Sequence, residues 1–143
     1  MAHEQASSSL SSLAVLGEMV YLYSVSQMHR SWPISSIHQW LLPALKHQQY
    51  RIYHRGKKPV GLVSWAHMTA VAETAYVRNV HSLQPKDWTG GDRNWVIDFL
   101  APFGDALRIG HDLRTNVFPN EVGRSLRMLK RGETRCLLNN LGP

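Results

Sequence analysis

One carboxylate inside an apolar run constrains this chain more than any other feature. Asp98 interrupts the segment 95–100, whose other side chains favour burial in a strand. An unpaired buried charge is costly, so the fold has to bring a partner to Asp98. Two interpretations stay open. Asp98 is either a structural carboxylate paired with Arg93 or a backbone amide, or a carboxylate that orients a catalytic histidine.

His29 is the histidine best placed in the sequence to use such a carboxylate. It follows the first expected helix and has Ser26 and Trp32 close to it along the chain. A histidine at this position either caps the helix dipole or acts as a general base. The other histidines are scattered without the spacing of a metal site, so no metal is expected.

Hydropathy periodicity predicts an α+β protein with a mainly antiparallel sheet flanked by helices. Residues 1–12 are expected to form a flexible N-terminal arm, and residues 13–143 a single domain. Helices are predicted over roughly 9–26 and from Pro33 to about Lys46, with a kink or early end at Pro43.

A hairpin is predicted from two strands over 50–54 and 60–66, followed by a buried strand over 94–100. Asp105 is expected to cap a helix over 106–117, and two closing strands are expected over 125–129 and 134–138. The pattern over 70–78 suits either a helix or a strand.

Composition limits the cellular compartment and the cofactors expected for the protein. The chain has 143 residues and a single cysteine, Cys136, which cannot form an internal disulfide and is expected to be an inert buried thiol. No apolar run is long enough for a membrane span, and no secretory signal is visible, so we expect a cytoplasmic protein. No glycine-rich phosphate-binding loop is present, so a bound nucleotide cofactor is not expected.

The net charge of +6 suggests an acidic partner. Basic side chains gather in the last third of the chain: Arg114, Arg124, Arg127, Lys130, Arg131 and Arg135. They form either a solvated face or a docking face for an acidic partner. Few aromatic residues lie among them, so a nucleic-acid platform is poorly supported.

Five segments, in order, resemble the RTX toxin-activating lysine acyltransferases, the family of haemolysin-activating proteins. The similar segments are Ser26-Gln27-Met28-His29-Arg30-Ser31-Trp32-Pro33, Pro59-Val60 with Ser64-Trp65-Ala66, Asp87-Trp88, Gly91-Asp92-Arg93 with Trp95, and Ile97-Asp98-Phe99-Leu100-Ala101-Pro102-Phe103-Gly104. The resemblance covers about residues 13–130. Gln27 stands where the family has proline.

The resemblance implies a GNAT-like acyltransferase fold and a bacterial cytoplasmic enzyme. It also implies transfer of a fatty acyl chain from acyl carrier protein to internal lysines of an RTX protoxin. The family's catalytic histidine and aspartate fall on His29 and Asp98. Acyl-loaded carrier protein would be the donor substrate, no bound cofactor is implied, and a homodimer is left open.

Further site residues are expected around this pair. Substrate binding is expected at Ser26, Arg30 and Trp32, and partner docking at Arg124, Arg127 and Arg131. The departure at Gln27 motivates an alternative: a catalytically weak relative that binds acyl carrier protein or toxin without transferring an acyl group.

Overall fold

The computed structural model describes residues 2–128 and 134–140, with side chains described over 11–126. Its helices are α1 (Ala2–Val25), α2 (Leu42–His47), α3 (Ala70–Arg78) and α4 (Ala106–Asp112). Shorter helical turns are η1 (Ile37–Leu41), η2 (Val80–Ser82), η3 (Pro85–Trp88) and η4 (Leu113–Val117). The strands are β1 (Tyr50–Arg55), β2 (Lys58–Met68), β3 (Arg93–Leu100), β4 (Val122–Met128) and β5 (Thr134–Asn140).

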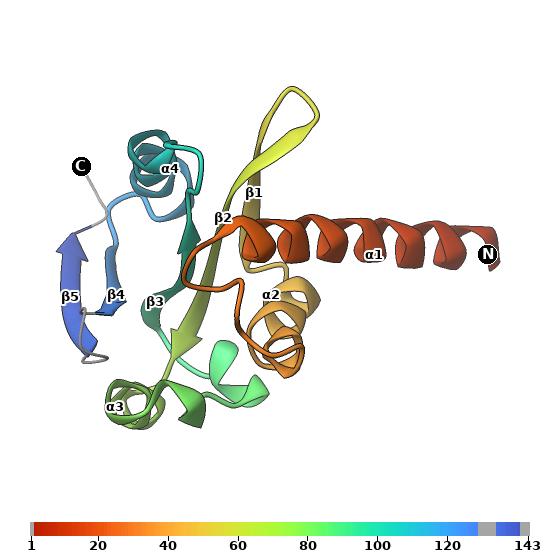
Figure 1. Cartoon of the computed structure of the whole chain (residues 1–143). Helices are drawn as coiled ribbons and strands as arrows, with labels where there is room; N and C mark the ends of the chain where they lie inside the picture. Colours follow the sequence, from red (N-terminus) through yellow and green to blue (C-terminus); the bar gives the residue numbers. More distant parts are fainter. Residues whose placement is uncertain (1, 129–133, 141–143) are drawn as a thin grey trace.

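The five strands form one sheet in the order in which they occur in the chain (Figure 1). Neighbouring strands are antiparallel except β3 and β4, which are parallel. That parallel pairing joins only Asn94–Val96 to Gly123–Ser125. The predicted α+β class and the mainly antiparallel sheet are therefore confirmed.

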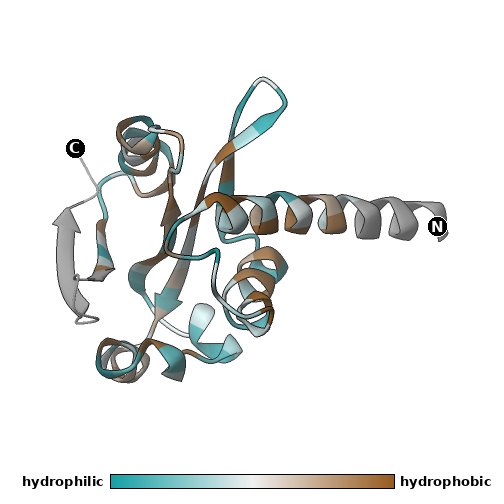
Figure 2. Ribbon diagram, in the orientation of Figure 1, coloured by the Kyte–Doolittle hydropathy of each residue, from teal (hydrophilic) through white to brown (hydrophobic). Residues whose placement is uncertain are grey.

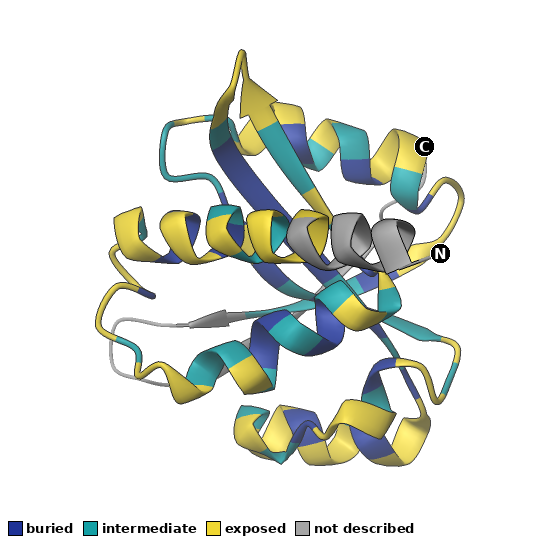
Figure 3. Ribbon diagram, turned by 90° about the vertical axis from the view of Figure 1, so that its right-hand side faces the viewer, coloured by how far each residue is buried: buried dark blue, intermediate teal, exposed yellow. Residues whose placement is uncertain are grey.

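Alternation along the strands separates the core into two faces. On one face, Leu62 and Leu100 pack with Met19 and Leu22 of α1. On the other face, Val63 and Val96 pack with Ile109 and Leu113, in and just after α4. The hydrophobic residues lie on α2, on the sheet and on the part of α1 nearest the sheet (Figure 2), and the outer side of α1 is exposed (Figure 3).

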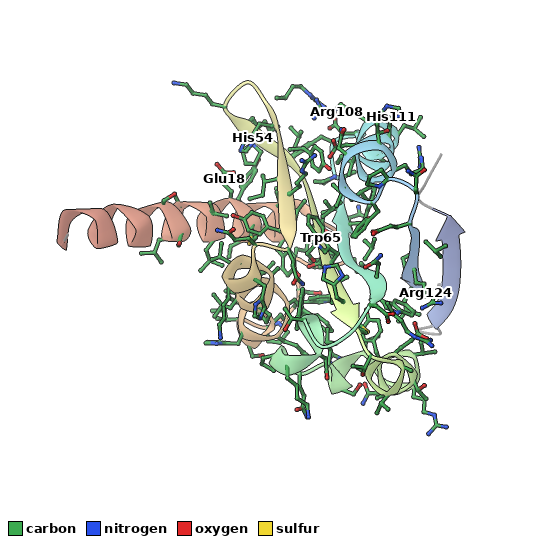
Figure 4. The ribbon with its side chains drawn as sticks, turned by 180° about the vertical axis from the view of Figure 1, so that it is seen from behind. Glu18, His54, Trp65, Arg108, His111 and Arg124 are labelled. Carbon is green, nitrogen blue, oxygen red and sulfur yellow. The ribbon has the colours of Figure 1, made fainter. Side chains whose placement is uncertain are left out.

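The first helix begins earlier than the sequence pattern predicted. It starts at Ala2 instead of about residue 9, so residues 2–12, expected as a loose arm, form its first turns. Ala2, Glu4 and Gln5 are good helix formers, which the polarity-based prediction did not weigh. Farther along, the ion pair between Glu18 and His54, with 2.7 Å between Oε2 and Nε2, joins α1 to β1 (Figure 4).

The second helical segment changes type just before Pro43, where the sequence predicted a kink or an early end. The π-helical turn η1 runs to Leu41, and Pro43 then occupies the first turn of α2. A proline is tolerated there because backbone amides of the first turn have no intrahelical acceptor. The segment 70–78, ambiguous in sequence, is helix α3, whose first turn is capped by Thr69 Oγ1 accepting from the amide of Ala72 at 3.1 Å.

The prediction that Asp105 caps the helix after it is wrong in one respect. Asp105 occupies the cap position of α4, but its side chain makes no capping hydrogen bond. Its carboxylate accepts instead from Arg55 at 2.7 Å, because the end of β1 brings that guanidinium within reach. The predicted hairpin and the strand over 94–100 are confirmed. Both closing strands are present, and residues 129–133 between them lie outside the described residues.

Candidate active site

A β-bulge in β3 directs Asp98 toward α1. Ser64 of β2 pairs with Asp98, while the next residue, Trp65, pairs with Val96, so Ile97 is the extra residue. Regular alternation would put Asp98 on the same face as Val96, which packs against α4. The bulge puts Asp98 on the α1 face instead, and such bulges often re-aim a side chain beside an active site.

The Ser64 side chain supplies a hydrogen-bond acceptor for the backbone amide of Asp98 at this bulge. The amide N–H of Asp98 donates to Ser64 Oγ at 3.1 Å, and the Ser64 side chain is fully buried. A buried amide without an acceptor would be costly. The serine in the family-like segment 64–66 therefore has a structural role beneath the carboxylate.

The loop after α1 places His29 above Asp98. The His29 Nε2 atom lies 3.4 Å from Asp98 Oδ1, and both side chains are buried. This distance permits strong charge coupling, but among the described residues His29 Nε2 has no hydrogen-bond partner of normal geometry. The predicted proximity of His29 and Asp98 is thus present in the structure, at slightly more than hydrogen-bond length.

The other ring nitrogen contacts Ser26. Ser26 Oγ lies 2.7 Å from His29 Nδ1. Placing the imidazole proton on Nε2 directs it toward the Asp98 carboxylate and leaves the Nδ1 lone pair to accept the Ser26 hydroxyl proton. The opposite tautomer would direct a lone pair at the carboxylate, so electrostatics favours the Nε2–H form. In this form the basic nitrogen is Nδ1, on the Ser26 side.

Tyr23 is a site residue that sequence reasoning missed. Its hydroxyl donates to Asp98 Oδ2, and its ring lies 4.5 Å from the ring of His29. Burial, and then the charge of Asp98, raises the pKa of Tyr23 far above its usual value, so the hydroxyl stays a proton donor. The sequence showed Tyr23 only as an apolar position of the helical stripe. Nothing in the pattern pointed to Asp98, 75 residues away.

A cavity of about 490 Å³ adjoins the His29–Asp98 pair. Its wall is largely aromatic and aliphatic, with Trp32, Trp40, Tyr76, Val80, Ile97 and Leu126 among its residues. Trp32 also packs on the His29 ring, with 4.4 Å between ring centres. Burial, and then the charge of Asp98, raises the pKa of Tyr76, so this side chain is uncharged in the cavity wall. The cavity therefore suits an apolar ligand whose polar end reaches His29.

Two of the three predicted substrate-binding residues contact His29, and the third does not line the cavity. Ser26 and Trp32 contact His29, as described. Arg30 follows His29 in the loop, but its side chain is exposed and does not line the 490 Å³ cavity.

The proposed docking arginines have different environments. Arg124 donates to Glu73 Oε2 at 2.6 Å and is partly buried, so its charge is already paired (Figure 4 labels its position on β4). The side chain of Arg127 and the whole of Arg131 lie outside the described part of the structure.

Arg93 is not the partner of Asp98. It pairs with Glu73, which also accepts a hydrogen bond from Trp95 Nε1 at 2.8 Å. The structural alternative for Asp98 is therefore wrong in naming Arg93. In the part of the chain that the structure describes, the contacts of its carboxylate are with the side chains of Tyr23 and His29, not with a backbone amide. Among the described residues, no group of three or more histidine, cysteine or acidic side chains could hold a metal ion.

The fold and site define an α+β protein in which a buried histidine–carboxylate pair adjoins an apolar cavity. A family model of the RTX toxin acyltransferases matches residues 8–140, and the chain belongs to this family. Within the described residues, no helix is long and apolar enough to cross a bilayer.

Individual relatives support this membership. The chain is 40% identical over 122 residues to an RTX-I toxin-activating lysine-acyltransferase of Actinobacillus pleuropneumoniae, covering 85% of this chain and 70% of the relative. It is 40% identical over 116 residues to a protein-lysine myristoyltransferase of Escherichia coli, covering 81% and 68%. An uncharacterised protein of Synechocystis is 39% identical over 123 residues, covering 85% and 84%.

Proposed function

We propose that the protein transfers a fatty acyl group from acyl carrier protein to the ε-amine of a lysine in an RTX protoxin. The observation that carries this proposal is the buried His29–Asp98 pair at the edge of the apolar cavity. The relatives' names as lysine acyltransferases support the same reaction. A GNAT-like fold and a cytoplasmic location remain parts of the proposal.

The reaction requires a base because a free lysine side chain has a pKa of about 10.4 and is mostly protonated at neutral pH. The lysine ammonium first gives one proton to solvent. The neutral amine nitrogen then attacks the thioester carbonyl carbon, the C–N bond forms, and the C–S bond breaks. His29 Nδ1 takes the surplus amine proton through the Ser26 hydroxyl, which passes its own proton to the ring. The proton now on Nδ1 is then passed to the thiolate, so the carrier departs as a thiol.

Asp98 has an electrostatic role in this step. As His29 accepts a proton, the ring becomes cationic, and the carboxylate oxygen at 3.4 Å stabilises that charge. Tyr23 holds the second carboxylate oxygen by its hydrogen bond. The low exposure of both partners strengthens the interaction relative to one in water.

The donor fits the remaining features. A fatty acyl chain would lie along the apolar wall formed by residues such as Trp40, Val80 and Leu126. Acyl carrier proteins are acidic, and the net charge of +6 provides an attractive field for one. The carrier protein supplies the acyl group as a substrate, so the proposal includes no bound cofactor.

Two variants test the proposal. The full chain is incubated with acyl-loaded carrier protein and a protoxin fragment, and acylated lysines are counted by mass spectrometry. His29→Ala should lower the rate by about 100- to 10,000-fold, because a general base is lost. Asp98→Asn keeps the shape of the side chain but removes its charge, so it should lower the rate with a smaller change in melting temperature.

The outcomes separate the two candidate functions. If the wild-type chain acylates the fragment and His29→Ala matches it within a few-fold, the general-base role is wrong. If the wild-type chain binds the carrier protein or the fragment but transfers nothing, the protein is a binding module, the alternative that Gln27 motivates.

A further inference from the structure

A second cavity shares part of its wall with the first, including His29. It has a volume of about 420 Å³ and is formed by the loop after α1 and by the end of β3 with the residues after it. The residues shared by the two cavities are Met28 and His29. The His29 side chain, although only 2% exposed, therefore borders two separate spaces.

The residues next to the two ring nitrogens of His29 line different cavities. Ser26, which contacts Nδ1, lines the second cavity and not the first. Asp98, which lies near Nε2, lines the first cavity and not the second. The nitrogen assigned above as the base thus faces the second cavity through the Ser26 hydroxyl.

The residues that line the second cavity differ in chemistry from those that line the first. Ser26 and Gln27 contribute polar groups on one side, and Phe99 is 42% exposed on the other. An exposed aromatic ring at the end of a strand can pack against methylene groups and attract a cation over its face. A lysine side chain combines four methylenes with a terminal cation, which is the combination that this wall fits.

We propose that the second cavity is the entry site for the acceptor lysine. The inference rests on the proposed function, since it divides the two substrates of that reaction between the two cavities. The acyl chain occupies the apolar cavity beside Asp98. The lysine of an extended polypeptide segment enters between Gln27 and Phe99, and its amine reaches the Ser26 hydroxyl. The two reacting atoms meet where the cavities share Met28 and His29.

Binding is tested without any turnover. Backbone amide resonances of the full chain are followed by NMR as Nα-acetyl-lysine N-methylamide is added, and in a separate titration as decanoate is added. The lysine probe should shift the amides of Gln27, Phe99 and Ala101, and decanoate those of Val80 and Ile97. Shifts by the lysine probe around Val80 and Ile97 instead, or at neither cavity, would overturn the proposal.

A matched pair of variants tests the same division during catalysis. Gln27 and Ser35 are both exposed, and each lines only one cavity, Gln27 the second and Ser35 the first. Gln27→Trp should raise the KM of the acceptor fragment at least tenfold and leave the KM of the acyl donor unchanged. Ser35→Trp should do the reverse. Lys57→Trp, in the exposed β1–β2 turn, controls for the added indole.

The results distinguish this inference from the proposed function. If the wild-type chain transfers acyl groups but Gln27→Trp leaves the acceptor KM unchanged, the entry site is wrong and the function stands. If no transfer occurs with the wild-type chain, yet the lysine probe shifts Gln27 and Phe99, the lysine site stands and the transferase function fails. A rise in donor KM in Gln27→Trp as large as that in Ser35→Trp would refute the division of the cavities.

Discussion

Three side chains, from α1, from the loop after it and from β3, arrange the imidazole of His29. Ser26 fixes one ring nitrogen of His29, Asp98 faces the other, and Tyr23 holds Asp98 from α1. Ser26 and His29 belong to one loop, so their closeness follows from sequence spacing. The approach of Tyr23 and Asp98 depends on how α1 packs against the sheet.

Tyr23→Phe tests the support of the carboxylate. The ring keeps its packing against His29, but Asp98 loses a hydrogen bond that, to a charged group, contributes about 1.5–3 kcal/mol. We expect kcat to fall about tenfold, the equivalent of about 1.4 kcal/mol in the barrier. The KM values should change little. Tyr21→Phe, on an exposed position of the same helix, is the matched control.

The kinetic constants and a thermal melt decide this prediction. A lower melting temperature with kcat unchanged would show that the Tyr23 hydroxyl supports only the fold. Equal losses of kcat in Tyr23→Phe and Tyr21→Phe would remove any specific link to Asp98.

The sequence located the central carboxylate but not all of its partners. A charged residue inside an apolar strand had to be paired, and that argument identified Asp98 before its neighbours were known. The catalytic role of His29 was predicted from the family-like motif, because a loop histidine after a helix can also simply cap the helix dipole. Tyr23 could not be found, since a tyrosine in an amphipathic stripe looks the same whether its hydroxyl meets solvent or a carboxylate.

Among the secondary-structure elements, β3 shows why a strand pattern does not determine a side chain's face. The apolar run correctly predicted a buried strand over 94–100. The bulge at Ile97, which puts Asp98 on the α1 face, has no sequence signature, because it arises from the pairing with β2. Likewise, the Thr69 cap favours a helix for α3. The apolar positions over 70–78 suit a helix or a strand equally, so the pattern alone did not reveal this local signal.

Ser64→Ala tests the bulge. The change leaves the buried amide of Asp98 without its acceptor, so the free energy of unfolding should fall by about 1–3 kcal/mol. Urea denaturation measures this loss, and Ser35→Ala, at an exposed serine, provides the comparison. Matching stabilities for the two variants would mean that the Asp98 amide does not depend on Ser64.

Glu73 of α3 ties two strands together. Burial opposes its ionisation, but hydrogen bonds from Trp95 and Arg93 and the charge of Arg124 hold the pKa of Glu73 below its usual value. A depressed carboxyl pKa stabilises the fold above the pKa of the unfolded chain, about 4.3. That contribution disappears as the pH falls through the pKa of the folded state.

Glu73→Gln should therefore destabilise the protein in a pH-dependent way. At pH 7 we expect a loss of about 2 kcal/mol, since one carboxylate serves Arg93, Trp95 and Arg124. The difference from wild type should shrink steadily as the pH falls from 5 toward 3, in thermal or urea melts. Asp92→Asn, at an exposed acid, is the control. A difference that stayed constant over this pH range would argue against the charge as its cause.

At the scale of the whole molecule, the fold determines which of the basic side chains are already paired with an acid. The sequence left Arg124, Arg127 and Arg131 on either a solvated face or a docking face, and in the structure Arg124 pairs with Glu73. Reversing Arg124 would damage the fold and confuse a binding test. The net charge itself was readable from composition, whereas the pairing of each cation depends on tertiary contacts.

A docking test should therefore use Arg127→Glu with Arg131→Glu and leave Arg124 in place. We expect weaker binding of acyl carrier protein and a flatter dependence of Kd on salt, because charge attraction acts over about 8 Å at physiological ionic strength. Titration calorimetry at several salt concentrations measures both effects. Lys57→Glu, in the β1–β2 turn, changes charge at another exposed site. Should the double variant keep the wild-type salt slope, the carrier protein docks on another face.

The short parallel pairing of β3 with β4 has a mechanical consequence. Among the described residues, the backbone pairing between β3, which carries Asp98, and β4, which carries Leu126, spans three residue pairs. The Glu73–Arg124 and Asn94–Glu121 hydrogen bonds add side-chain links beside it. Local opening of such a seam costs less than global unfolding. Separation along it would widen the apolar cavity sideways while His29 and Asp98 stayed together. Such opening would give a long hydrocarbon chain a second way into the cavity, from the side of β4.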